Sequence, residues 1–244
     1  MKKNAKVIED VMGRLLKPIG FDCRGSIYIR QSGLQVHGID FQSGKHGNGE
    51  FTINLCFHYS FIPSCATFEA KDPLHFKLID FGLRDRLGML VKKEDVWFTT
   101  NTPQKELMDQ MEGVANSCIS VFKNCESSWG EVDFFPRFLA LEAVREWLDW
   151  LAYSAKSTKD FSVLLSEEAK RFSHWPAGLI EFFHGWGREV QNTLIFLIEC
   201  SIRSGRKAVA LEYLELANRL CYDYDPFLRR LEKLRAQCQV PLKT

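Results

Sequence analysis

The chain has 244 residues, enough for one large domain or two small ones, and 45% of them are hydrophobic, which allows a sizeable core. Its 32 Lys and Arg residues nearly balance its 31 Asp and Glu residues, so we expect neither a nucleic-acid-binding surface nor a strongly acidic one. No apolar run reaches the roughly 18–20 residues that span a bilayer. The charged N-terminal stretch does not look like a signal peptide, so we expect a cytoplasmic protein that does not contact membranes.

The cysteines indicate the same compartment. Eight are scattered along the chain, and none forms a Cys-x-x-Cys pair. Disulfide frameworks are typical of small secreted chains, whereas this chain is large. We interpret the cysteines as free, mostly buried thiols in a reducing cytosol.

The first elements follow from residue patterns. Apolar residues at helical spacing predict a helix over 4–17, which a proline and a glycine end. Residues with β-branched and aromatic side chains predict strands over 25–31 and 34–42. Ser32 and Gly33 between them are typical of a two-residue hairpin turn.

A glycine-rich turn over 43–50 leads into "FTINLCFHY" (51–59). In this stretch aromatic and aliphatic residues at odd positions alternate with Thr52, Asn54, Cys56 and His58. We interpret it as a half-buried central antiparallel strand, with one apolar face and one more polar face. A fourth strand is predicted over 76–83.

The rest of the chain is predicted to be mostly helical. Pro103 suits the first position of a helix over 103–124, with Thr102 as its cap. Further helices are predicted over 137–155, 159–171, 189–203 and 207–222, and from Asp225 to about residue 237.

These elements predict an α+β fold with two parts. Residues 1–130 would form an α+β domain, a small antiparallel sheet of about four strands with flanking helices. Residues 131–244 would form an all-helical C-terminal bundle packed on that domain.

Three segments carry a family resemblance. They read "LLKPIGFDCRGSIYIR" (15–30), "DFQSGKHGNGEFTINLCF" (40–57) and "RDRLGMLVKKEDVWF" (84–98). In order and spacing they resemble the bacterial family catalogued as domain of unknown function 4304, over about residues 5–125. The chain departs from the family pattern at Cys56, where glycine is usual, and at Phe98, where a second tryptophan is common. The matching positions are Pro18, Gly20, Phe21, Arg24, Gly25, Gln42, Ser43, Phe51, Thr52, Asn54, Leu55, Arg84, Arg86, Leu87, Gly88, Asp95 and Trp97.

This resemblance implies a general role for the protein but no chemical reaction. The family has no agreed enzymatic activity, and its members are cytoplasmic bacterial proteins. Some are encoded among polymorphic-toxin genes, where small α+β proteins act as immunity partners. A protein-binding role is therefore the leading hypothesis, and it rests on association.

Two catalytic or metal-binding interpretations are weak. His37, His46 and His58 with Cys56 could meet across a hairpin, but zinc ligands usually come in close pairs joined by a turn, which a strand does not supply. The triplet Glu69-Ala-Lys71 has the carboxylate-lysine form of some magnesium-dependent nucleases but lacks a strand around it. We predict no metal, no cofactor and no catalytic residue.

The stronger candidates are binding residues. Arg84 and Arg86, two apart on an extended segment, would point the same way and could clamp an anion, or one could pair with a nearby carboxylate and the other meet solvent. Asn54 and His58 would lie on the polar sheet face. Trp150 and Trp186 could be exposed interface anchors or part of an aromatic core between the two halves. The acidic, aromatic tip between two helices adds Tyr222, Asp223 and Tyr224.

We therefore predict a non-enzymatic bacterial protein-binding module. It would be an immunity protein that neutralises a cognate toxin effector by covering the active site of the toxin. The alternative is a ligand-binding protein or an enzyme that uses the polar sheet face, with Arg84 and Arg86 as an anion clamp.

Overall fold

The computed structural model describes residues 2–45, 48–67, 69–92, 94–129, 190–220 and 225–239. The chain divides into two compact units, and each is described by itself. The first comprises Met1–Gly130 and Gly185–Arg188, and the second Glu131–His184 and Glu189–Thr244. The helices predicted over 137–155 and 159–171 lie outside the described residues.

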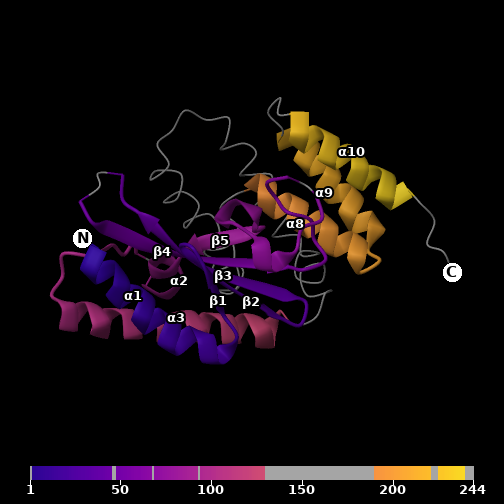
Figure 1. Cartoon of the computed structure of the whole chain (residues 1–244). Coiled ribbons are helices and arrows are strands. Elements are labelled where there is room, and N and C mark those ends of the chain that lie inside the picture. Colours follow the sequence, from indigo (N-terminus) through magenta and orange to yellow (C-terminus); the bar gives the residue numbers. More distant parts are fainter. Residues whose placement is uncertain are drawn as a thin grey trace. The chain divides into compact units, whose positions relative to one another are not determined.

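The sheet of the first unit contains six described strands, all paired antiparallel (Figure 1). Their order is β1-β2-β3-β4-β5, and the short β6 pairs with the beginning of β4. The predicted antiparallel α+β architecture is therefore confirmed, with two more strands than expected. The strands are β1 Asp22–Arg24, β2 Ile27–Ser32, β3 Gln35–Ser43, β4 Glu50–Tyr59, β5 Leu83–Arg86 and β6 Phe98–Thr99.

The predicted hairpin forms, with its turn one residue later than expected. Ser32 pairs with Gln35, so Gly33 and Leu34 make the turn, and Gly33 takes a left-handed φ of 58°. The strand predicted over 76–83 is wrong. A 3-10 turn over Leu78–Asp80 replaces most of it, because the Asp80 carboxylate accepts the backbone N–H of Lys77 and closes the turn locally.

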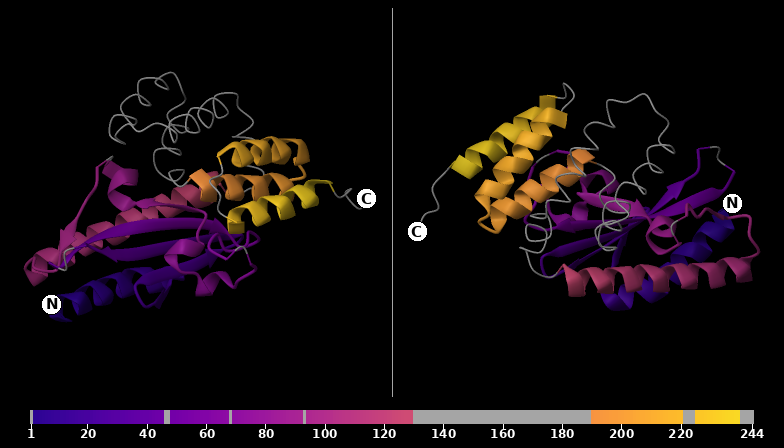
Figure 2. Two further views of the ribbon diagram at one scale, coloured as in Figure 1. Left: turned by 90° about the horizontal axis from the view of Figure 1, so that it is seen from above. Right: turned by 180° about the vertical axis from the view of Figure 1, so that it is seen from behind.

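Helices cover one face of the sheet. The helices α1 (Lys2–Leu16) and α3 (Gln104–Ser128) lie along it, as Figure 2 shows. Here Phe122 of α3 is fully buried, and the hydroxyl of Tyr59 donates to the carbonyl oxygen of Trp129 at 2.7 Å. The predicted Thr102 cap is wrong: Pro103 is the N-cap residue, and no side chain caps this end.

The other face is partly covered by the irregular segment 60–82. Phe76 and Phe81 from this segment pack against apolar residues of β2, β3 and β4. A Cβ atom on Gly38 would lie 2.7 Å from Cζ of Phe81, so the sheet can approach this segment only with glycine at that position. As a result β4 is buried on both faces, and the expectation of a half-buried strand is wrong.

The described part of the second unit is helical, as predicted. It contains α8 (Val190–Arg203), α9 (Lys207–Leu220) and α10 (Asp225–Gln239). Gly205, with a left-handed φ of 75°, ends α8. Glu199 and Arg230 form a buried ion pair between α8 and α10. Among the described helices of the whole chain, none combines the length and the apolar character needed to cross a membrane.

Candidate functional site

Polar side chains from three neighbouring strands share the sheet face opposite α1 and α3. In the register of the sheet, Asn54 on β4 lies between Asp40 on β3 and Arg86 on β5. Residues paired across antiparallel strands project from the same face, so these three side chains are neighbours. The same register aligns Arg84 with Cys56, so both arginines leave β5 on this face, as their spacing predicted.

Asn54 belongs to a buried hydrogen-bond network. Its amide nitrogen donates to Oδ2 of Asp40 at 3.3 Å and to Oε1 of Gln42 at 3.1 Å. The Ser26 hydroxyl donates to the other Asp40 oxygen at 3.2 Å. Asn54 and Asp40 are each only 7% exposed. Because its amide group is engaged in this way, Asn54 links β4 to β3 below the surface and stabilises the sheet.

Arg86 lies in a more exposed group, which we call the Trp97 cluster and which consists of Arg86, Asp95 and Trp97. The Arg86 guanidinium forms an ion pair with the Asp95 carboxylate, which also accepts the Trp97 indole N–H at 3.0 Å. The guanidinium carbon stands 5.0 Å from the centre of the Trp97 ring, a cation–π distance. Trp97 is 41% exposed, so the cluster presents a fixed aromatic ring at the surface.

The pairing of Arg86 affects the anion-clamp alternative. An incoming phosphate or carboxylate would have to compete with Asp95, which already takes the guanidinium. Arg84 and Arg86 both belong to β5, so the extended segment expected for them is itself a strand. This geometry suits the presentation of a surface better than the capture of a small anion.

His58 lies in the interior of the first unit. Its Nδ1 accepts the Gly82 backbone N–H at 3.0 Å, and its Nε2 stands 3.0 Å from the carbonyl oxygen of Ile62. These partners fix the tautomer that carries its proton on Nε2. Burial lowers the pKa of His58 to about 4, so the ring is neutral near pH 7. Its ring nitrogens therefore anchor the segment over the sheet.

His37 is buried on the opposite face, in a network that the sequence did not indicate. Its Nδ1 accepts a hydrogen bond from Nε of Arg30 at 3.2 Å, and its Nε2 lies 2.9 Å from Oε1 of Gln35. Arg30 also pairs with Glu126 of α3 at 2.7 Å. Burial and then the Arg30 charge lower the pKa of His37 to about 3. No local signal could have found this network, because Arg30 and Glu126 are far apart in the chain.

The described residues do not form the metal or nuclease sites considered from the sequence. His37 pairs with Phe57 and not with His58 in the register, so the two histidine rings leave opposite faces of the sheet. Within the described ranges no three His, Cys, Asp or Glu side chains are placed to hold a metal ion. Lys71 of the Glu-x-Lys triplet pairs with the buried carboxylate of Asp80. His46 lies outside the described residues.

The predicted binding residues of the second half cannot be placed. Trp150, Trp186, Tyr222, Asp223 and Tyr224 all lie outside the described residues. The predicted site residues that the structure describes are Asn54, His58, Arg84 and Arg86. All four side chains leave the same face of the sheet, and His58 is fully buried there.

A cavity of about 300 Å³ lies on another part of the first unit, between the edge of β4 and two helices. The short helix α2 (Leu87–Lys92) forms one wall, and the middle of α3 forms the other. The sequence did not predict α2, because six residues are too few for a periodic pattern to stand out. The lining residues are Thr52, Ile53, Leu87, Gly88, Val91, Lys92, Val96, Phe98, Gln110, Gly113, Val114 and Ser117.

Comparison with known proteins supports the resemblance seen in the sequence. A family model described as Domain of unknown function (DUF4304) matches residues 12–148, which is more than half of the chain. No curated protein and no solved structure matches. The matched range contains the whole described sheet, the Trp97 cluster and the cavity.

Proposed function

Because the chain belongs to the Domain of unknown function (DUF4304) family, whose name assigns no activity, we propose a function from its own surface. It is a non-enzymatic protein-binding module that acts in the bacterial cytoplasm. Its partner is a toxin effector, and the chain neutralises that effector by covering its active site. The occurrence of family members among polymorphic-toxin genes supports the choice of partner, as an association.

The Trp97 cluster is the observation that carries this proposal. Tryptophan and arginine are the residues most enriched at the energetic centres of protein interfaces. Here the indole N–H is held by Asp95 and one ring face by Arg86, while 41% of Trp97 remains exposed. A ring that is fixed before binding loses little side-chain entropy when a partner covers it. All three residues also belong to the segments that carry the family resemblance.

The cluster supplies both affinity and selectivity. A partner that buries Trp97 gains apolar contact with the ring. The same partner must also match the charges of Arg86 and Asp95 at its border, and a wrong charge there is costly. The buried network under Asp40 and Asn54 holds this part of the sheet in place before binding. The mechanism is therefore occlusion by a preformed surface.

Co-expression with the product of the adjacent upstream gene tests the proposal. We expect the two proteins to copurify as a tight complex, and we expect the chain to protect cells from that product. Trp97→Ala should weaken the complex about 30-fold, the effect of an interface residue worth about 2 kcal/mol. The matched control is Leu34→Ala, because Leu34 is also 41% exposed but belongs to the β2–β3 turn.

Three outcomes would reject parts of the proposal. If the two products do not copurify, the toxin partner is wrong. If Trp97→Ala and Leu34→Ala bind alike, the partner uses another surface. If no protein binds and a phosphorylated metabolite does, with loss on Arg84→Ala and Arg86→Ala in folded protein, the ligand-binding alternative replaces the proposal.

A further inference from the structure

The cavity between α2 and α3, which we call the α2–α3 pocket, has the size of a small-molecule site. Its volume is about 300 Å³, and pockets for small ligands begin at about this size. An apolar cavity of about half that volume already suffices to bind a molecule such as benzene. Most of its lining is apolar, with valine, leucine, isoleucine and phenylalanine side chains from β4, α2, α3, β6 and the chain just before β6.

Two glycines shape this pocket in different ways. A Cβ atom on Gly88 would lie 2.5 Å from the carbonyl oxygen of Glu94, so glycine there lets the chain pass close to α2. Gly113 differs, because a Cβ atom on it would meet nothing within 4 Å. Gly113 lies in the middle of α3, where glycine is unfavourable for the helix. Close packing therefore does not explain Gly113, which is exposed on the pocket lining and leaves open space there.

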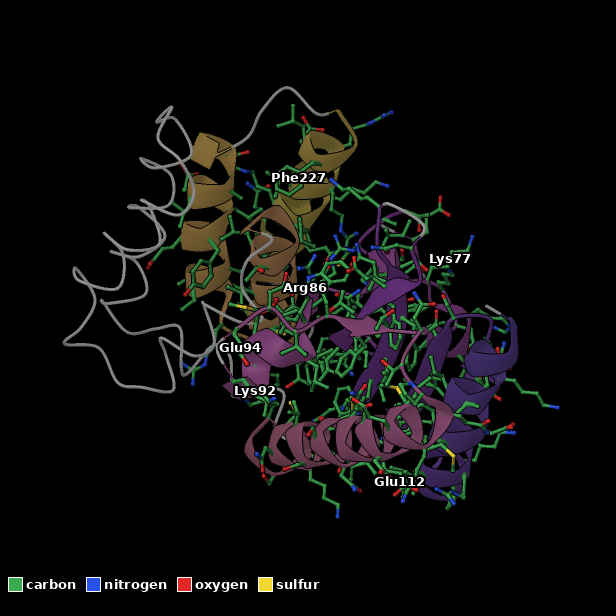
Figure 3. All side chains as sticks on the ribbon, turned by 90° about the vertical axis from the view of Figure 1, so that its left-hand side faces the viewer. Lys77, Arg86, Lys92, Glu94, Glu112 and Phe227 are labelled. Atoms are coloured by element: carbon green, nitrogen blue, oxygen red, sulfur yellow. The ribbon has the colours of Figure 1, made fainter. Side chains whose placement is uncertain are left out.

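The polar groups of the lining indicate the charge of a ligand. Among the described residues that line the pocket, Lys92 alone carries a charge, and it is exposed at the C-terminal end of α2 (Figure 3). The Ser117 hydroxyl donates to the Gly113 carbonyl oxygen at 2.9 Å, and the Gln110 amide to Glu106 at 3.3 Å. The Lys92 ammonium is thus the lining donor suited to a negative group, and the lining offers no carboxylate to repel one.

We propose that the α2–α3 pocket binds a medium-chain aliphatic carboxylate. The hydrocarbon chain lies among Ile53, Val91, Val96 and Val114, and the carboxylate meets the Lys92 ammonium at the rim. Apolar walls with a single cation at the mouth complement a molecule that is apolar along its length and anionic at one end.

This inference is independent of the proposed protein-binding function. The chain from 96 to 98 places Val96 and Phe98 in the pocket lining, whereas Trp97 is absent from that lining and contacts Arg86. The pocket and the Trp97 cluster can therefore be perturbed separately. A failure of one proposal leaves the other standing.

Isothermal titration calorimetry of the full chain with decanoate tests the proposal. We expect saturable binding at one site with a Kd below about 1 mM. Affinity should fall at least tenfold from decanoate to hexanoate, because fewer methylene groups are buried. Methyl chemical-shift changes at Val91, Val96 and Val114 should locate the ligand in the pocket.

Two variants separate the apolar and the charged contributions. Gly113→Leu fills the pocket and should weaken decanoate binding at least tenfold in protein that melts as the wild type does. If that variant does not fold, Lys92→Gln still tests the site. It should weaken decanoate about fivefold and leave decanol unchanged, since decanol has no charge. Lys123→Gln, an exposed lysine of α3 beyond the pocket, is the control and should bind like the wild type.

Several results would overturn the proposal. No saturable heat with decanoate at millimolar concentration would show that the pocket is not a carboxylate site. Equal binding of decanoate and decanol, unaffected by Lys92→Gln, would reject the carboxylate and favour a neutral ligand. If the α2–α3 valine methyls shift only on addition of the toxin partner, the occupant is an apolar side chain of that partner.

Discussion

The two faces of the sheet are covered by different kinds of structure. On one face lie the two long helices α1 and α3, whose backbone groups are satisfied within each helix. On the other face lies the irregular segment 60–82, in which the described residues form only short 3-10 turns as regular structure. Helices need only an apolar stripe to cover a sheet, whereas an irregular segment must find other partners for its backbone groups.

Asp80 is the partner that the irregular segment uses. It is 1% exposed, and its carboxylate binds the Lys71 ammonium, the Ser64 hydroxyl and the Lys77 backbone N–H. Burial alone would raise the pKa of Asp80, but the hydrogen bonds from Lys71, Lys77 and Ser64 outweigh it and hold the pKa below its usual value. Aromatic rings therefore pack on both faces, but the irregular segment depends in addition on the buried carboxylate of Asp80.

The largest loss of stability is expected on the sheet face that α1 and α3 cover. Phe122→Ala should destabilise the first unit by about 4 kcal/mol, because it empties a fully buried site. The Phe122 ring stacks on His37 at 4.4 Å between centres and lies 5.9 Å from the Phe21 ring. Guanidinium unfolding measures the change, with exposed Lys123→Ala as the control. A loss below about 1 kcal/mol would show that ring packing does not hold this face.

The next largest loss of stability is expected on the sheet face that segment 60–82 covers. Asp80→Asn removes the charge and replaces one acceptor oxygen with a donor, so we expect a loss of about 3 kcal/mol. The loss should be local: amide exchange should speed up across 60–82 and stay slow in α1 and α3. The exposed Asp72→Asn is the control, because asparagine caps a helix turn as well as aspartate does. Uniform loss of protection across both faces would contradict the difference drawn between them.

Each face also buries one neutral histidine, and this makes the fold sensitive to acid. In the unfolded chain a histidine takes up a proton below about pH 6.5, whereas folded His37 and His58 do so only near pH 3 and pH 4. The unfolded state therefore binds more protons as the pH falls, and stability is lost below about pH 6.5. Between pH 7 and pH 5 each histidine should cost about 2 kcal/mol.

Replacing one histidine at a time measures how much of this loss of stability each of them causes. His58→Gln, which can still donate to the Ile62 carbonyl, should reduce the loss between pH 7 and pH 5 by about 2 kcal/mol. His37→Gln should do the same on the other face. His75→Gln, with its side chain 59% exposed, should leave the pH dependence close to that of the wild type. If either buried variant keeps the full acid sensitivity, that histidine is already protonated in the folded protein.

The sequence predicted the elements whose signals are local. Helical periodicity located α1, α3, α8, α9 and α10, and strand composition located β2, β3 and β4. It could not show that β4 is buried on both faces, because Phe81 covers Gly38 from more than forty residues further along the chain. Alternation in sequence separates the two faces of a strand, but it does not say what covers each of them.

The candidate site was predictable to a similar extent. The spacing of Arg84 and Arg86 placed both on one face, as found. Arg86, Asp95 and Trp97 were all noted as positions of the family resemblance, but only the turn through α2 brings them into contact. His58 was misleading, because a polar residue on a strand is often exposed and here it anchors a covering segment. The α2–α3 pocket had no sequence signal other than a glycine inside a helix.

The smallest expected effect is a gain at that glycine. Gly113→Ala should stabilise the first unit by about 1 kcal/mol, because alanine favours the helix and its Cβ atom would meet nothing within 4 Å. Guanidinium unfolding measures this gain, and Ala115→Gly, at a fully buried site of the same helix, should instead cost at least as much. A stabilised Gly113→Ala variant with weaker decanoate binding would show that α3 gives up stability to keep the pocket open. Unchanged or lower stability would mean that a contact at Gly113 requires the absence of a side chain. The open pocket would then no longer be needed to explain a glycine inside α3.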